Sequence, residues 1–210
     1  MKKNILINDY PLTVSDKLFN KVWDLALPYQ DKRDDKGHAQ IVTWYAIKLT
    51  EMECVDSYVT IPAAILHDIG WSQLTRKERF LIFDITRTRE QDQEIRIKHQ
   101  NEGVKLGRKI LIQVKYPQQH IDHILEIVSQ HDTRNGFYSQ EDGVMRDADK
   151  LWRVSRYGFA KDLKRSAFTP QELFNKQNEA FCSQGFLFSK SAIELARKKL
   201  EKRKIEYNLG

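Results

Sequence analysis

The amino-acid sequence predicts an all-α fold, a bundle of helices packed around one apolar centre. In several segments apolar residues recur at steps of three and four, the spacing of one buried helix face. No segment shows the alternation of apolar and polar residues that is typical of a strand, and no βαβ rhythm is present. Hydrophobic residues make up 40% of the 210 residues, which is enough for a core and excludes a disordered chain.

In the first third of the chain, the pattern predicts an irregular arm and then three helices. Thr13-Val14-Ser15-Asp16 is a start signal for the first helix, which Pro28 ends. The second carries an apolar stripe from Ile41 to Met52 at steps of four, four and three. The third is strongly apolar, with Pro62 near its first turn, where a missing N–H does little harm. The expected segments are the arm over 1–14 and helices over 16–27, 38–53 and 58–68.

The middle of the chain predicts two helices that each carry an inward-facing histidine. His99 belongs to an apolar stripe that runs from Ile95 to Ile110 along a long helix. On the following helix His131 comes three residues after Val128, so it also faces the interior. The expected segments are a loop with a short helix over 69–89, helices over 90–114 and 117–131, and a turn-rich loop over 132–145.

The last third predicts three more helices. Asp147 and Asp149 open the first of these, because acidic residues suit the positive N-terminal end of a helix. The other two are expected over 170–183 and 187–206. The final helix is dense in Lys and Arg, and we expect its apolar side to pack on the core, leaving a solvated basic face. Nucleic-acid binding is not expected, because aromatic residues do not interleave the basic ones.

Charge and cysteine content restrict the classes of partner and compartment. The formal net charge is +6 and the pI is about 9.2, which favours anionic partners such as phosphorylated small molecules. The two cysteines lie far apart and outside any CxxC pattern, so reduced thiols in a cytoplasmic protein are expected. No apolar run is long enough for a signal peptide or a membrane span, so we expect no membrane partner.

Residues of the types that bind metals fall at positions expected to face the core. The pair His67-Asp68 ends an apolar helix just before Gly70, and burying such a pair is costly unless a cation binds it. Each candidate alone has an ordinary explanation, since a lone inward histidine is usually a hydrogen-bonded core residue. Four of the six histidines in one apolar interior would be destabilising without cations to gather them. The candidates are His38, His67, Asp68, His99, His131 and Asp149.

The order of these residues resembles the HD-domain superfamily of metal-dependent phosphohydrolases. The resemblance covers roughly residues 15–160, which would form an HD-like metal-binding core between the arm over 1–14 and C-terminal helices over 161–210 packed on that core. The minimal family pattern binds one metal, and the additional His99 and His131 are similar to the dinuclear branch. The matching motifs are Gly37-His38, Leu66-His67-Asp68-Ile69-Gly70 and Ala148-Asp149-Lys150-Leu151.

The resemblance implies a role for each candidate ligand. Asp68 would bridge two ions and would be, with His67, a catalytic residue. Asp147 is a neighbouring alternative for the last ligand, but Asp149 sits in the matching Ala-Asp-Lys-Leu context. The mixed nitrogen and oxygen donors suit one or two divalent ions of Mn, Fe, Zn, Co or Ni. The implied groups are His38, His67 and Asp149 for one ion and His99 with His131 for the other.

The favoured function is a metal-dependent phosphohydrolase that acts on a small phosphate ester or nucleotide. Two cations about 4 Å apart would share a hydroxide that attacks phosphorus, and basic residues would hold the remaining phosphate. For each basic candidate a solvated surface position is an equal alternative. The basic candidates are Arg33, Lys36, Arg134, Lys150 and Arg153.

Two departures from the family pattern and two alternative functions accompany this interpretation. Trp71 stands where dinuclear enzymes tend to carry Lys, and the Gly-Tyr-Pro signature is absent, which disfavours a cyclic-dinucleotide substrate. The first alternative is a diiron oxygenase that uses the same six ligands. The second is a non-enzymatic binding module in which the metals are structural and the basic C-terminal helix carries the interaction.

Overall fold

The computed structural model describes residues 7–12 and 16–210, and the secondary structure of these residues is helical, as predicted. The α-helices are α1 (Lys17–Ala26), α2 (His38–Glu53), α3 (Ser57–Leu66), α4 (Arg76–Leu81), α5 (Arg89–Gln113), α6 (Gln118–Gln130), α7 (Gln140–Val154), α8 (Arg156–Arg165), α9 (Pro170–Cys182) and α10 (Lys190–Glu206). Two short 3-10 helices are η1 (Leu27–Tyr29) and η2 (Ile69–Gln73).

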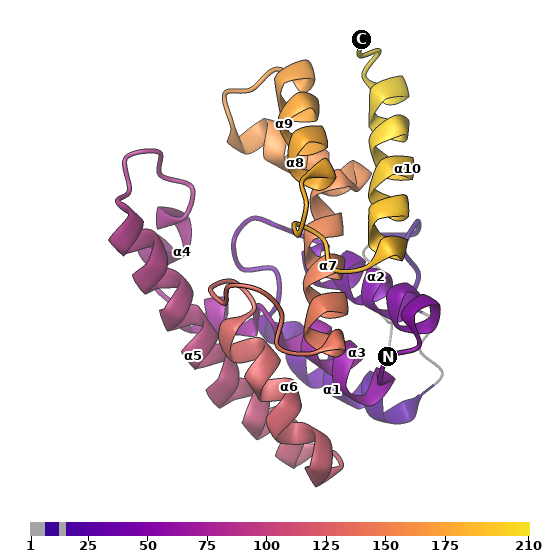
Figure 1. Cartoon of the computed structure of the whole chain (residues 1–210). Helices are drawn as coiled ribbons and strands as arrows, with labels where there is room; N and C mark the ends of the chain where they lie inside the picture. The colour runs from indigo at the N-terminus through magenta and orange to yellow at the C-terminus, as the bar shows by residue number, and fades with distance from the viewer. Residues whose placement is uncertain (1–6, 13–15) are drawn as a thin grey trace.

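The helices surround one hydrophobic core. α2, α3 and α7 form the middle of the molecule, α5 and α6 lie side by side on one flank, and α8, α9 and α10 gather at the opposite end (Figure 1). The main core draws on every described α-helix except α4, so the C-terminal helices share it with the rest of the described chain. Its fully or almost fully buried members include Val22, Leu49, Leu66, Ile124, Leu151 and Leu200. A second, smaller cluster consists of Trp71, Leu74, Ile82 and Ile95.

The turn after α3 lies directly against α5. A Cβ on Gly70 would stand 1.9 Å from the carbonyl oxygen of His99 and 2.4 Å from the backbone nitrogen of Gly103. Only a residue without a side chain permits this approach of two backbones. The contact brings the end of α3, which carries His67 and Asp68, beside His99 on α5.

The position of Pro62 differs from the expectation. Pro62 is the sixth residue of α3 and lies inside the helix, not in its first turn, because the helix begins at Ser57. A proline there cannot donate to the carbonyl four residues earlier, that of Tyr58. The hydroxyl of Tyr116 donates to this carbonyl over 2.8 Å and replaces the missing partner.

The start of α7 also differs from the expectation. The helix begins at Gln140 instead of Asp147, so the Asp142-Gly143 pair, expected to form a turn in a loop, lies in its first turn. Ser139 caps the helix by accepting from the backbone nitrogen of Asp142. Gly143 is needed for packing, because a Cβ there would lie 2.3 Å from the ring of Phe188.

The two ends of the chain bear on the predicted domains. Residues 1–6 and 13–15, which include most of the expected start signal, lie outside the described residues, and Asp16 caps α1 by accepting from Leu18. The predicted boundary at residue 160 falls inside α8, a helix that the sequence pattern did not predict. Among the helices that the structure describes, each is too short or too polar to cross a lipid bilayer.

Candidate metal centre

The six predicted ligands converge at the middle of the helical bundle in two groups of three. In each group every residue offers one donor atom, and the three donors lie within 4.8 Å of one another. The donors come from helices far apart in the sequence, so the fold itself assembles them. The groups are His38, His67 and Asp149, and Asp68, His99 and His131.

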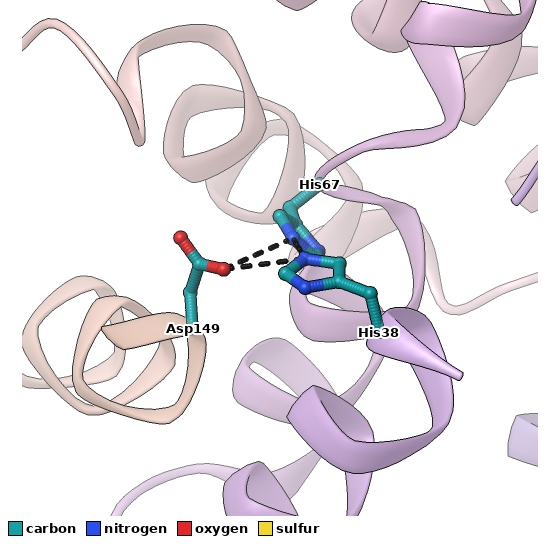
Figure 2. Close-up of side chains that lie close together, drawn as sticks. All are labelled: His38, His67 and Asp149. Carbon is teal, nitrogen blue, oxygen red and sulfur yellow. Dashed lines mark hydrogen bonds and ion pairs between the residues drawn. The ribbon is translucent and has the colours of Figure 1, made fainter. Parts of the chain in front are cut away.

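The first group joins the start of α2, the end of α3 and the middle of α7. The Nε2 atoms of His38 and His67 are 3.1 Å apart. The Oδ1 atom of Asp149 lies 3.3 Å from the first and 3.6 Å from the second. Figure 2 shows both rings directed toward this carboxylate oxygen.

The second group joins α5 with the residue that follows α6. The Nε2 atoms of His99 and His131 are 3.4 Å apart. The Oδ1 atom of Asp68 lies 3.6 Å from the Nε2 atom of His99 and 3.5 Å from that of His131.

Asp68 lies between the two groups and faces both. Its second oxygen, Oδ2, lies 3.3 Å from the Nε2 atom of His38 and 3.5 Å from that of His67. One carboxylate oxygen therefore approaches each group. A bridging ligand in a dinuclear centre has this arrangement, which is the role that the family resemblance implied for Asp68.

The donor spacing fits cations shared within each group. Two donors that each lie about 2.1 Å from one ion, at angles of roughly 90–110°, are about 3.0–3.4 Å apart. The two nitrogen pairs, at 3.1 Å and 3.4 Å, fall in this range. Imidazole nitrogens and carboxylate oxygens are also the donors that divalent transition metals prefer. The residues present therefore fit the metal centre that the fold family implies.

Backbone carbonyls orient two of the imidazoles. The Nδ1 atoms of His67 and His131 lie 2.8 Å and 2.9 Å from the carbonyl oxygens of Ala64 and Val128. Because a carbonyl only accepts, each Nδ1 donates, and the neutral ring keeps its lone pair on Nε2, which faces the donor groups. Such a second hydrogen bond is characteristic of metal-binding histidines.

The loop before α2 fixes the position of His38. The carboxylate of Asp31 accepts from the backbone nitrogens of Gly37 and Ala39 over 2.7 Å and 3.0 Å, which caps the start of α2. Gly37 has a φ of 90°, a conformation that glycine adopts without strain. His38 is therefore held as the first residue of the helix, with its ring edge-on to Trp152.

The charges of the centre shift the protonation of its members. Burial disfavours protonated His38, but hydrogen bonds to Asp149 and Asp68 and their negative charges outweigh it and raise its pKa to about 10. Burial acts the same way on His131, but Asp132 and Asp68 raise its pKa to about 9. Burial and the adjacent His131 lower the pKa of His99 to about 3. The metal-free centre therefore holds cationic and neutral imidazoles side by side.

The carboxylates of Asp68 and Asp149 remain ionised. Although burial would raise the pKa of Asp68, the positive charges of Arg33 and of neighbouring imidazoles hold it well below its usual range. Burial likewise opposes ionisation of Asp149, yet its hydrogen bonds to His38 and His67 keep its pKa far below normal. Both carboxylates therefore offer charged oxygens to the centre.

Of the predicted substrate-binding residues, Arg33 lies at the centre. Its guanidinium forms an ion pair with Asp68, lies 3.2 Å from Oδ2 of Asp35, and stands 4.6 Å from the centroid of the Trp71 ring. Its side chain is 14% exposed, so it forms part of the wall around Asp68 and is not a solvated surface residue.

The other basic candidates contact residues outside the two groups. Arg134 forms an ion pair with Glu126. Lys150 donates to the carbonyl of Phe186 over 2.6 Å. Lys36 is exposed, and the Arg153 side chain, 58% exposed, lies 3.7 Å from Asp162.

The choice between Asp147 and Asp149 has a clear structural basis. The Asp147 carboxylate accepts from the backbone nitrogens of Phe188 and Ser189 and from the Ser189 hydroxyl, all over 2.8 Å. It therefore fixes the segment that leads into α10, while Asp149 faces the histidines.

Sequence reasoning missed two residues at the centre. The Nε1 atom of Trp71 donates to Oδ1 of Asp68 over 2.9 Å, and its ring stacks on His99 with centroids 4.0 Å apart. Asp132 lies 3.7 Å from Nε2 of His99. The signal for Asp132 was present, because His131-Asp132 repeats the pair His67-Asp68.

Comparison with known proteins identifies the fold. No protein-family model and no curated protein sequence matches the chain. Among solved structures, the fold is similar to that of a "predicted HD superfamily hydrolase" from an uncultured Thermotogales bacterium, with a TM-score of 0.57. The match covers 91% of this chain and 87% of that chain at 17% sequence identity. It confirms the predicted HD-like helical bundle at the level of the fold, with the His and Asp groups at its centre.

Proposed function

We propose that the protein is a metal-dependent phosphohydrolase that acts on a small phosphate ester or nucleotide. The observation that carries the proposal is Asp68, whose two carboxylate oxygens approach two separate groups of ligands. The neighbouring structure is described as a predicted HD superfamily hydrolase, which supports hydrolysis as the class of reaction.

Each part of the centre has a distinct task in this proposal. His38, His67 and Asp149 would hold one ion, and His99 with His131 the other, with Asp68 common to both. Bound divalent ions supply a water of lowered pKa and neutralise charge on the phosphoryl oxygens. The Nδ1 hydrogen bonds of His67 and His131 keep the rings oriented without any movement during a reaction.

Arg33 is the residue best suited to bind the phosphate group. Its planar guanidinium can form two parallel hydrogen bonds to an oxyanion, and it already lies against Asp68. The ring of Trp71 and the carboxylate of Asp35 hold this guanidinium in place. An anionic substrate would replace Asp68 as the partner of Arg33 in the metal-loaded protein, because the Asp68 carboxylate would then hold the cations.

The test is the release of p-nitrophenol from p-nitrophenyl phosphate and bis-p-nitrophenyl phosphate, and of phosphate from a panel of nucleotides, with Mn²⁺ and under argon. We expect metal-dependent release by the wild type and a loss of more than about 100-fold in His67→Ala and Asp68→Ala, beyond the effect of losing an outer partner. His120→Gln is the matched control, since His120 contacts Asp56 and Tyr58 outside the centre. Full activity in both ligand variants, or turnover that needs iron and oxygen, would contradict the proposal.

A further inference from the structure

Asp132 lies at the edge of the second group of ligands. It follows His131 after the end of α6, and its Oδ2 atom lies 3.7 Å from Nε2 of His99 and 3.9 Å from Nε2 of His131. The same oxygen is 3.0 Å from Nη1 of Arg96. Its side chain is only 20% exposed, so the carboxylate is directed inward.

The backbone around Asp132 is tied to the residue next to His99. Gln100 is 1% exposed, and its Oε1 atom accepts from the backbone nitrogen of Asp132 over 3.3 Å. Its Nε2 atom donates to the hydroxyl of Thr133 over 3.0 Å and to the carbonyl of Ser129. Because Gln100 adjoins His99 on α5, it fixes Asp132 and His99 relative to each other.

The two groups become alike in composition when Asp132 is included. The first consists of two imidazoles and the carboxylate of Asp149, with an oxygen of Asp68 nearby. The second would consist of two imidazoles and the carboxylate of Asp132, with the other oxygen of Asp68. Donors on opposite sides of one ion lie up to about 4.2 Å apart, so the distances of Asp132 are compatible with sharing an ion with His99 and His131.

We propose that Asp132 is a ligand of the second metal ion, so that each ion is held by two histidines, one carboxylate of its own and one oxygen of Asp68. This inference rests on the metal centre of the proposed function. A role as ion-pair partner of Arg96 explains one contact of the Asp132 carboxylate, but not its approach to both Nε2 atoms. Arg96 also pairs with Asp92 over 2.7 Å, and the backbone of Asp132 is held independently by Gln100.

Matched ligand sets have a measurable consequence. A second site without a carboxylate of its own would bind a divalent cation more weakly, because one anionic donor would be missing. The wild type is therefore expected to take up two Mn²⁺ ions per chain.

The experiment is a calorimetric titration of the metal-free protein with Mn²⁺, together with the electron paramagnetic resonance spectrum of the loaded protein. Asp132→Asn is expected to keep one Mn²⁺, to bind the second at least ten-fold more weakly, and to lose the spectrum of a coupled pair. Asp132→Glu keeps the charge and the ion pair with Arg96 but displaces the carboxylate, and it is also expected to weaken the second ion. This second variant tests the proposal even if Asp132→Asn does not fold.

Two control variants separate coordination from the ion pair. Arg96→Gln removes the partner of Asp132 and Asp92→Asn removes another partner of Arg96, and both should retain two ions. Two Mn²⁺ ions with wild-type affinity in Asp132→Asn or Asp132→Glu would overturn the role of Asp132 and leave the proposed function intact. If Arg96→Gln lost the second ion to the same extent as Asp132→Asn, the role of Asp132 as a ligand would also be overturned. The ion pair with Arg96 would then be sufficient to explain the effect of Asp132→Asn. A wild-type protein that binds no Mn²⁺ would overturn both the role of Asp132 and the proposed function.

Discussion

At the scale of single residues, His67 and His131 are positioned by the same local device. Each directly follows a helix, α3 or α6, and each Nδ1 donates to the carbonyl three residues earlier. The last carbonyls of a helix lack intrahelical partners, so these hydrogen bonds also satisfy the helix end. The orientation of both rings is thus set by backbone atoms, which no side-chain substitution in the centre removes.

The protonation of His38 and His131 predicts a pH-dependent affinity for metals. Their pKa values of about 10 and about 9 mean that both imidazoles carry a proton at pH 7 in the metal-free protein. A ligand imidazole must be neutral, so cation binding has to displace these protons. The apparent affinity for Mn²⁺ is therefore expected to increase as pH rises from 6 toward 9, and to fall on acidification.

Calorimetry at pH 7 in two buffers with different enthalpies of ionisation measures this release. We expect at least one proton per chain to leave when Mn²⁺ binds. His120→Gln should release the same number, because His120 lies outside both groups of ligands. A binding enthalpy that is identical in the two buffers would show that no proton leaves and would refute the prediction.

At the scale of elements, α3 contains a proline that another segment compensates. Pro62 leaves the Tyr58 carbonyl without its helical donor, and the hydroxyl of Tyr116 supplies one across 58 residues of sequence. Tyr116 is a buried residue of the segment that connects α5 to α6. Its contact therefore links α3 to the flank that carries His99 and His131.

A double-mutant cycle tests this compensation. Tyr116→Phe should lower the free energy of unfolding by about 1–2 kcal/mol, because it leaves a carbonyl unpaired. In a Pro62→Ala background the new backbone N–H can reach the same carbonyl, so the same substitution should cost less than about half as much. Urea denaturation of the four proteins measures both values. Equal costs in the two backgrounds would mean that the hydroxyl does not replace the proline's missing donor.

Elements with a clear local signal were predicted from the sequence, and elements set by tertiary contacts were not. The apolar stripe predicted α2 over 38–53, which matches the observed His38–Glu53, although Met52 in that stripe is 50% exposed. The start of α7 was missed because Asp142-Gly143 favours a turn until the ring of Phe188 packs against the glycine. The start of such a helix depends on contacts with segments distant in the sequence, and the local sequence pattern carries no information about these contacts.

At the scale of the whole molecule, the metal centre joins most of the core helices. Its ligands come from α2, α7, α5 and the residues that follow α3 and α6. Separating any of these helices would break the centre, so cation binding there would be coupled to the folding of the bundle.

Divalent cations are therefore expected to raise the thermal stability of the protein. At a Mn²⁺ concentration one hundred times the Kd, one site adds about 2.7 kcal/mol to the free energy of unfolding. For a chain of this length, that corresponds to an increase in Tm of about 5–10 °C. Differential scanning calorimetry with and without a chelator measures the change. Asp149→Asn should reduce it and His120→Gln should not, whereas an unchanged Tm in the wild type would contradict the coupling.

The motifs predicted which residues meet at the centre, but not the direction of long side chains. His38, His67 and Asp149 were identified because helix faces and short motifs fix where their short side chains lie. Lys150 and Arg134 are long and flexible, and they contact Phe186 and Glu126, which only the folded structure brings within reach. Their proposed contacts with substrate remain predictions, as does that of Arg33.

The contact between Gly70 and α5 fixes the spacing between two backbone segments that carry ligands. Gly70 lies against the carbonyl of His99, and Asp68 lies two residues before Gly70. Main-chain atoms therefore fix the position of Asp68 relative to His99. Substitutions of the ligand side chains would leave this main-chain contact in place. A displacement of the 25-residue helix α5 would move the backbone of His99 relative to Asp68, so this contact helps to set the spacing between the two groups of ligands.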